Sequence, residues 1–303
     1  MRLFLALLLL LSLSACEQQA ATSTVAPQPT PPPTTDPLMP VVAVSELTLG
    51  PNRIALGLIR AGTPINDPDL ELALRIFYLD GENPTEVHSE SRAVYRGDGL
   101  PFGLYVGYAD FDQPGGWGLE LAITQGEGVL GSSRIRLDVK ADSPIPAVGE
   151  AAIPSQNLTI RDVPDLEQLT SDVSPDPDFY QLTIAEALEA AKPFLVTFAT
   201  PGYCVTAVCA PNQMVLKQLK AEYGAQVNFL HVEVFAYPFA EALQAQRYVP
   251  AMGEWGLRTE PWTFLVDAEG IIQARFEGGI TFAEMEPALA QLATGAPVRL
   301  LLP

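Results

Sequence analysis

The chain contains few charged residues and very few basic ones. Only 17% of its 303 residues are charged, and 36 acidic residues stand against 17 basic ones, which gives a net charge of −19. Nucleic-acid binding needs a basic surface for the phosphate backbone, so this composition argues against that class of function. A chain of this length is predicted to form two domains of ordinary size, each with its own core.

Cysteine and histidine are also scarce, with three cysteines and two histidines in the whole chain. His88 has no other histidine or cysteine near it in sequence, so we expect a surface or core residue and no metal site there. Cys204 and Cys209 lie where an apolar run turns into an amphipathic helix. The free N–H groups and the dipole of a helix N-terminus favour a thiolate, so this arrangement is typical of a redox site or of a small disulfide.

The third cysteine, Cys16, ends a segment with the features of an export signal. Arg2 precedes the apolar run 3–13, and two small residues follow it. This pattern is typical of a cleaved signal and not of a spanning helix. Residues 13–16 resemble the lipobox of bacterial lipoproteins, which implies cleavage before Cys16 and a lipid on its sulfur; a simple signal peptide is the alternative. The expected location is the bacterial cell envelope, outside the cytoplasm, where the chain is lipid-anchored to a membrane and disulfides persist.

Two sequence regions follow this N-terminal segment. Residues 17–40 are rich in Pro and Thr with almost no large apolar side chains, so we predict an extended tether. Residues 41–140 contain short runs in which apolar residues alternate with others, separated by Gly- and Pro-rich turns. This pattern predicts an immunoglobulin-like β-sandwich, with Trp117 in its core. No catalytic constellation appears in it, and its expected role is a spacer, a docking surface or a partner-recognition module.

The pattern changes again towards the C-terminus. Residues 141–173 are predicted to be a second linker, and residues 174–303 an α/β domain. Thr183, with Glu186 three residues later, predicts a capped helix start. The remaining predicted elements are a strand at 193–200, a helix at 211–223, a strand at 227–234, a partly helical segment at 239–248, strands at 263–266 and 271–276, and a helix at 282–293. This order predicts a mixed sheet with helices on both faces.

This order of elements, with a cysteine pair after the first long strand and the segment 259–264 before the later hairpin, resembles the thioredoxin superfamily over residues 174–293. The resemblance implies a thioredoxin-like fold and thiol–disulfide chemistry. The superfamily has a cis proline beside its cysteine site, and Pro261 is at the matching place, where an X-Pro bond can be cis. Glu260, Pro261 and Trp262 are therefore implied to bind substrate, with Glu260 able to influence the pKa of a thiol. For Trp255 and Trp262, packing in the core is an equal alternative.

The cysteine spacing departs from the Cys-x-x-Cys of that superfamily, which leaves two registers open. In one, Cys204 takes the place of the first cysteine and the loop is expanded behind it. In the other, residues 209–212 overlay Cys-Gly-Pro-Cys, and Asn212 replaces the second cysteine. We prefer the second because Pro211 suits a first helical turn, which makes Cys209 the expected nucleophile and Cys204 its resolving partner. Five residues on one helix are about 7.5 Å apart in rise, so a disulfide requires Cys204 to lie off the helix.

A further departure is Thr197, which aligns with the buried acidic residue of thioredoxin's first long strand, so that proton transfer from the partner thiol needs water or another group. The predicted function is a membrane-tethered thiol–disulfide oxidoreductase that uses no cofactor and no metal. Its predicted partners are protein thiol or disulfide substrates and a redox donor.

Other functions stay open. One alternative is a thioredoxin-like binding module braced by a structural disulfide. Another is a thiol peroxidase, because Thr200-Pro201-Gly202 and the four-residue cysteine spacing resemble the bacterioferritin-comigratory class of peroxiredoxins, and Arg258 resembles the peroxiredoxin arginine. A copper role is weaker, since copper carriers of the thioredoxin superfamily pair two cysteines with a histidine, and His231 is expected to point along its strand.

Overall fold

The computed structural model describes residues 36–300, so Cys16, the predicted signal peptide and most of the predicted tether lie outside the described residues. From Asp36 onward the chain forms a single unit. None of the helices between residues 36 and 300 is long and apolar enough to cross a membrane.

The N-terminal half of the described chain is all β, as predicted. Its strands are β1 (Met39–Val42), β2 (Leu47–Thr48), β3 (Gly50–Arg60), β4 (Thr63–Pro64), β5 (Glu71–Tyr78), β6 (Val87–Tyr95), β7 (Tyr105–Phe111), β8 (Gly115–Gln125) and β9 (Gly128–Lys140). They are ordered β1-β3-β7-β6-β5-β8-β9-β2, with β4 paired to β3. An immunoglobulin-like sandwich of two separate sheets is not confirmed. Strand β6 pairs with β5 along most of its length and with β7 at Val94 and Tyr95, so it joins the strands into one sheet that curls over its own core.

Alternating burial builds that core. In β5, the buried Leu72, Leu74 and Ile76 alternate with three exposed residues, Glu71, Ala73 and Arg75, and Trp117 of β8 is fully buried in the same core. Each such side chain contributes about 1.5–3 kcal/mol through burial. Strands β3 and β7 depart from this alternation, because consecutive residues in both are buried. The second face of β3 and β7 is therefore buried as well, and it packs against residues of the C-terminal half.

The C-terminal half is α/β. Its elements are η1 (Leu166–Gln168), η2 (Pro177–Tyr180), α1 (Ile184–Glu189), β10 (Phe194–Ala199), α2 (Cys209–Tyr223), β11 (Asn228–Glu233), α3 (Phe239–Gln244), α4 (Pro250–Glu254), β12 (Trp262–Val266), β13 (Ile272–Glu277) and α5 (Phe282–Ala293). The capping box of Thr183 and Glu186 is present as predicted. Helix α2 begins at Cys209, two residues before the predicted start. Helix α4 was not predicted, although Pro250 at its first position is a recognised start signal.

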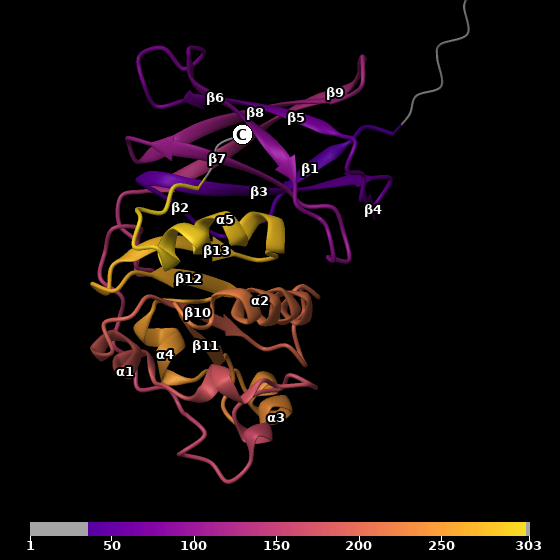
Figure 1. Cartoon of the computed structure of the whole chain (residues 1–303). Helices are drawn as coiled ribbons and strands as arrows, with labels where there is room; N and C mark the ends of the chain where they lie inside the picture. The colour runs from indigo at the N-terminus through magenta and orange to yellow at the C-terminus, as the bar shows by residue number, and fades with distance from the viewer. Residues whose placement is uncertain (1–35, 301–303) are drawn as a thin grey trace, which may run out of the picture. The chain divides into compact units, whose positions relative to one another are not determined.

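The sheet of this half has the order β11-β10-β12-β13, with β10 and β11 parallel and the other pairs antiparallel. Every residue of β10 is buried, because helices cover both faces of the sheet (Figure 1). Val196 and Phe198 pack in one core with residues of α1, α3 and α4. Leu195 packs in the other with α2 and α5. The mixed sheet between two helical layers agrees with the predicted element order and directs the end of β10 at the cysteine loop.

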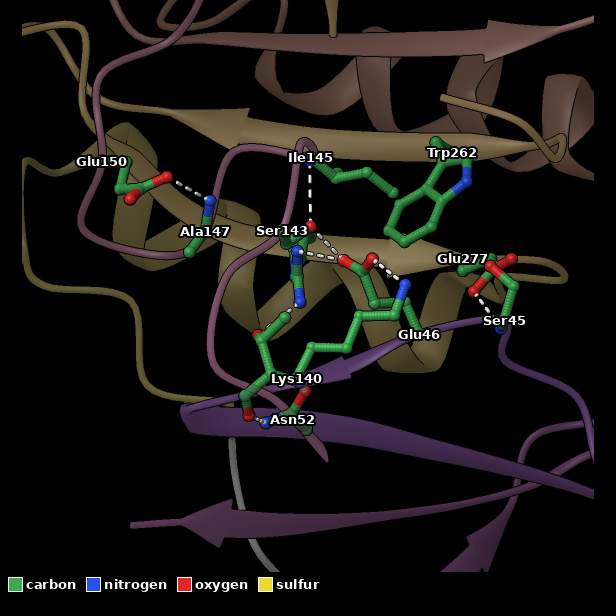
Figure 2. Close-up of polar contacts among 12 residues, drawn as sticks. Ser45, Glu46, Asn52, Lys140, Ser143, Ile145, Ala147, Glu150, Trp262 and Glu277 are labelled. Carbon is green, nitrogen blue, oxygen red and sulfur yellow. Dashed lines mark hydrogen bonds and ion pairs between the residues drawn. The ribbon is translucent and has the colours of Figure 1, made fainter. Parts of the chain in front are cut away.

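Polar side chains join the two halves. Arg53 of β3 is buried, and its guanidinium donates to both carboxylate oxygens of Glu284 at 2.6 and 2.9 Å. It also donates to the carbonyls of Glu277 and Gly279, each at 2.8 Å. Figure 2 shows a second group of contacts, in which the Ser45 N–H donates to Glu277 across the two halves, and Glu46 accepts from Ser143 and from Lys140 of its own half.

Candidate redox site

A disulfide joins Cys204 to Cys209 at the N-terminus of α2. Cys204 lies in the turn between β10 and α2, and Cys209 is the first residue of the helix. The two Cα atoms are 5.9 Å apart, within the range that a disulfide requires. This separation is possible because Cys204 is off the helix.

The two sulfurs differ in their access to solvent. Cys209 is 0% exposed, whereas Cys204 is half-buried in a turn whose neighbour Val205 is 90% exposed. An incoming thiolate attacks the sulfur that it can reach. In the disulfide form, that sulfur belongs to Cys204.

The N-terminal sheet packs against the start of α2, beside Cys209. Val208, which precedes it, is buried with Leu100, Leu104 and Val106 of that sheet and its loops. Close approach is needed here: a Cβ atom on Gly279 would lie 2.8 Å from a methyl group of Leu100. The second face of β7 is therefore buried against the start of α2.

Asn212 replaces a cysteine in the preferred sequence register, and it has a structural role in α2. It is 1% exposed. Its amide donates to the carbonyl of Gly278 at 2.9 Å, and its side-chain oxygen accepts from the N–H of Ile280 at 3.0 Å. Asn212 thus ties α2 to the loop between β13 and α5, the same loop that Arg53 holds from the other side.

Glu260 brings a carboxyl group to the buried cysteine. The Glu260–Pro261 peptide bond is cis, and Oε2 of Glu260 lies 4.0 Å from Sγ of Cys209. The same oxygen accepts from the N–H of Thr200 at 2.5 Å. Burial, with a smaller contribution from the charge of Glu233, raises the pKa of Glu260 to about 7 against the lowering effect of the Thr200 hydrogen bond. A carboxyl with that pKa can both give and take a proton near neutral pH.

The position that holds the acidic residue in thioredoxin holds no carboxyl here. Thr197 is 0% exposed, and its hydroxyl lies 3.2 Å from the carbonyl of Trp262 and 3.1 Å from the hydroxyl of Thr263. It joins β10 to β12 and forms no hydrogen bond with either cysteine. The sequence left open that a group other than residue 197 accepts the proton. Glu260, which reaches the site from the loop before β12, is available for this role.

The remaining residues implied to bind substrate are buried. The ring of Trp262 is 2% exposed, stacks on Phe264 and donates from Nε1 to Thr259 at 2.9 Å. Pro261 is buried, and its carbonyl accepts from the N–H of Gly278 at 2.9 Å. The Trp262 side chain is thus packed in the core, the alternative that the sequence left open for it, and its role in substrate binding stays a prediction. Trp255 is also in the core, at 0% exposure.

His231 is a buried residue of the sheet, as expected from its strand. Nδ1 lies 2.7 Å from the hydroxyl of Tyr180, and Nε2 lies 3.0 Å from the carbonyl of Ala199. Burial lowers the pKa of His231 to about 4, so the ring is neutral and donates to that carbonyl. Within residues 36–300 no group of three or more His, Cys, Asp or Glu side chains could hold a metal ion.

Sequence reasoning missed one acidic residue of this site, Glu233. It is the last residue of β11 and pairs with Ala199 at the end of β10, so it lies where the chain leaves the sheet towards the cysteine loop. It is 5% exposed. A signal was present in the sequence, because a lone carboxylate in the apolar run 227–235 needs partners or a shifted pKa.

Comparisons with known proteins agree with the α/β half. A family model described as a thioredoxin-like domain matches residues 180–293. No curated protein matches the chain. Among solved structures, a thiol:disulfide interchange protein of the thioredoxin family from Chlorobium tepidum TLS is similar at 13% identity and a TM-score of 0.31, over 51% of this chain and 99% of that one.

A family 76 glycoside hydrolase from a bovine Bacteroides thetaiotaomicron strain is similar at 13% identity and a TM-score of 0.25, over 36% of this chain. The chain spans 21% of the length of that hydrolase. At these TM-scores the two structural likenesses carry no argument about function. The family match and the elements described above agree, and residues 180–293 of this chain are a thioredoxin-like domain.

Proposed function

We propose that the chain is a thiol–disulfide oxidoreductase of protein substrates, working with a redox donor and held by a lipid on Cys16 to a bacterial membrane outside the cytoplasm. One observation carries the chemistry: a disulfide at a helix N-terminus has one sulfur open to solvent and the other 4.0 Å from the carboxyl of Glu260. The anchoring rests on the lipobox-like residues 13–16 and the Pro-rich stretch after them.

The difference in burial supports roles opposite to those expected from the sequence. A substrate thiolate attacks Sγ of Cys204, a bond forms between these two sulfurs, and the Cys204–Cys209 bond breaks. Sγ of Cys209 leaves with the bonding electrons, and the protonated carboxyl of Glu260 gives it a proton. The substrate is then joined to Cys204, Cys209 is a thiol, and Glu260 is a carboxylate.

In the reducing direction, the thiolate of reduced Cys204 attacks a substrate disulfide, one substrate sulfur leaves as a thiolate, and the other stays joined to Cys204 in the same mixed disulfide. The Glu260 carboxylate takes the proton of Cys209, and the resulting thiolate attacks Sγ of Cys204. The Cys204–Cys209 bond forms, and the substrate sulfur leaves as a thiolate. Glu260 supplies in both directions the proton transfer that Thr197 cannot supply.

An insulin-reduction assay driven by dithiothreitol tests this function. We expect Cys204→Ser and Cys209→Ser to abolish the catalysed rate, and Glu260→Gln to lower it by about 10²-fold, in the range typical of a lost acid–base group. Glu189→Gln, at an exposed position at the end of α1, is the matched control and should leave the rate unchanged. If Cys204→Ser keeps the parent rate, the disulfide is a structural brace and the proposal fails.

Trapping of the mixed disulfide tests the roles of the two cysteines. With Cys204 as the entry sulfur, the Cys209→Ser protein accumulates a covalent complex with the substrate, because no thiol remains to release it. The Cys204→Ser protein accumulates none, since Cys209 is buried. Complex formation by Cys204→Ser alone would restore the order expected from the sequence.

A further inference from the structure

Glu233 is a second buried carboxyl beside the redox site, and the mechanism above does not use it. Its Oε2 accepts from the N–H of Ser171 at 2.7 Å and from the Ser171 hydroxyl at 3.0 Å. Its Oε1 is buried with no hydrogen-bond partner among the described residues. Burial raises the pKa of Glu233 to about 7, against the lowering effect of its hydrogen bonds to Thr200 and Ser171.

Thr200 connects this carboxyl to the one that contacts Cys209. Its N–H donates to Oε2 of Glu260 at 2.5 Å, and its hydroxyl lies 3.3 Å from that of Ser171, which in turn donates to Glu233. The Ser171 hydroxyl also accepts from the N–H of Gly202 in the cysteine loop at 2.9 Å. Thr200 and Ser171 therefore connect the two carboxyls, and the network extends into the loop that contains Cys204.

The charged and titratable groups around Glu233 leave Glu260 as its main electrostatic partner. From α2, Lys217 forms an ion pair with Asp172 at 2.7 Å and also donates to the carbonyl of Ser174, so that its charge is already compensated. On the same strand, His231 is neutral. The Tyr180 hydroxyl is bonded to His231, and a high pKa caused by burial keeps it neutral too.

Glu233 also faces space that protons can enter. It lines a cavity of about 390 Å³ between the segment 156–169 and the elements β11, α3 and α4. The other carboxyl of this lining, Glu254, bonds to Ser155. A group at this place can exchange its proton with solvent while it stays in contact with the site.

We propose that Glu233 is a positioning residue of the redox site: Glu233 and Glu260 carry one negative charge between them near neutral pH, so Glu233 sets the pH at which Glu260 can protonate Cys209. Two adjacent buried carboxylates disfavour full ionisation of both. When Glu260 gives its proton to Cys209, the new charge is tolerated because Glu233 stays protonated. The inference deepens the proposed function and depends on it.

The test is the pH dependence of opening of the disulfide by dithiothreitol, with the rate constant expressed per dithiothreitol thiolate and followed at the Cys204–Cys209 pair by mass spectrometry. The parent protein should open faster on the acid side of a single inflection near neutral pH. Glu233→Gln should move that inflection to lower pH by at least about half a unit. At a pH above the inflection this shift changes the opening rate by roughly threefold. Glu260→Gln should remove the inflection.

The two substitutions together decide how Glu233 acts. Because Glu233 works through Glu260, Glu233→Gln should change nothing further in the Glu260→Gln background. An equal shift in both backgrounds, or no shift in either, overturns the inference. Loss of the inflection in Glu260→Gln with no shift in Glu233→Gln would overturn it and leave the proposed function standing.

A conservative variant guards against misfolding of Glu233→Gln. Thr200→Val removes a hydrogen bond that lowers the pKa of Glu233 and keeps both carboxyls. It favours neutral Glu233 and should shift the inflection in the same direction, by a smaller amount. Glu189→Gln should leave the profile where it is, and a shift in the opposite direction for Thr200→Val contradicts the inference.

Discussion

Arg53 offers a quantitative test of how the N-terminal sheet is joined to the thioredoxin-like domain. Its side chain and that of Glu284 are only 3% and 2% exposed, and the guanidinium donates to Glu284, Glu277 and Gly279. Burial would lower the pKa of Arg53, but the Glu284 carboxylate outweighs that effect and raises it, so the guanidinium stays charged. Arg53→Met keeps much of the side-chain volume and leaves Glu284 with a single described hydrogen-bond donor, the hydroxyl of Tyr108 at 3.0 Å.

Loss of one partner of a buried ion pair costs about 3–5 kcal/mol, because the other charge remains buried without compensation. We expect Arg53→Met to lower the free energy of unfolding by this amount. Replacing both partners by apolar residues avoids the uncompensated charge, so Arg53→Met with Glu284→Leu should lose less than Arg53→Met alone. The two backbone carbonyls that lose their donor in both variants should account for most of the loss that remains.

Urea unfolding followed by tryptophan fluorescence measures these differences. Trp117 reports on the β half, whereas Trp255 and Trp262 report on the thioredoxin-like domain. A loss below about 1 kcal/mol for Arg53→Met would refute the reasoning, because a solvent-exposed ion pair contributes no more than that. A loss in the double variant equal to that of Arg53→Met would refute it as well. Arg92→Met, on the outer side of β6, is the matched control and should change stability by less than about 0.5 kcal/mol.

Three further predictions concern the residues around Cys209. The pKa of Glu233 is raised from 4.5 to about 7 on folding, so this group's contribution to stability falls as pH rises through that window. Glu233→Gln should therefore unfold at a higher temperature than the parent at pH 8, where the difference in stability is on the order of 3 kcal/mol, and at the same temperature at pH 3.5, below both pKa values; equal melting points at pH 8 would contradict this. Leu100→Ala uncovers Val208 and should raise the alkylation rate of Cys209 in the reduced protein, measured by peptide mass spectrometry, whereas an unchanged rate would show that the β half does not shield it. Asn212→Ala removes two buried hydrogen bonds and should cost about 1–3 kcal/mol in urea unfolding, and a loss smaller than that would mean that α2 is held by packing alone.

The thioredoxin-like domain could be predicted because its elements have strong local signals. Strand β10 is a continuous apolar run, Thr183 and Glu186 form a capping box, and Gly224 follows the last turn of α2. Each of these signals depends on a few neighbouring residues. The start of α2 was placed two residues too late, because Val208 caps the helix without a side-chain hydrogen bond and gives no cap signal in sequence.

The β half was less predictable, because its arrangement depends on pairings between distant strands. Alternation identified the strands and the buried face of β5, but nothing in the sequence of β6 shows that its last two residues turn to pair with β7. One available signal was overlooked. In β3, the run 52–56 is buried without alternation, a pattern typical of a strand that is covered on both faces, and it indicates the contact with the thioredoxin-like domain.

The site shows why comparison by sequence position alone left the proton acceptor open. The expected acid position holds Thr197, and from that substitution the sequence predicted that proton transfer needs water or another group. A proton acceptor needs only to lie within reach of the sulfur, and the cis bond before Pro261 belongs to a loop that brings Glu260 to 4.0 Å from Cys209. The cost of burying that carboxylate is reduced by the hydrogen bond from Thr200 and increased by the charge of Glu233. An acid held in this way responds to its neighbour, so the activity of this site should follow the charge of Glu233 as well as that of Glu260.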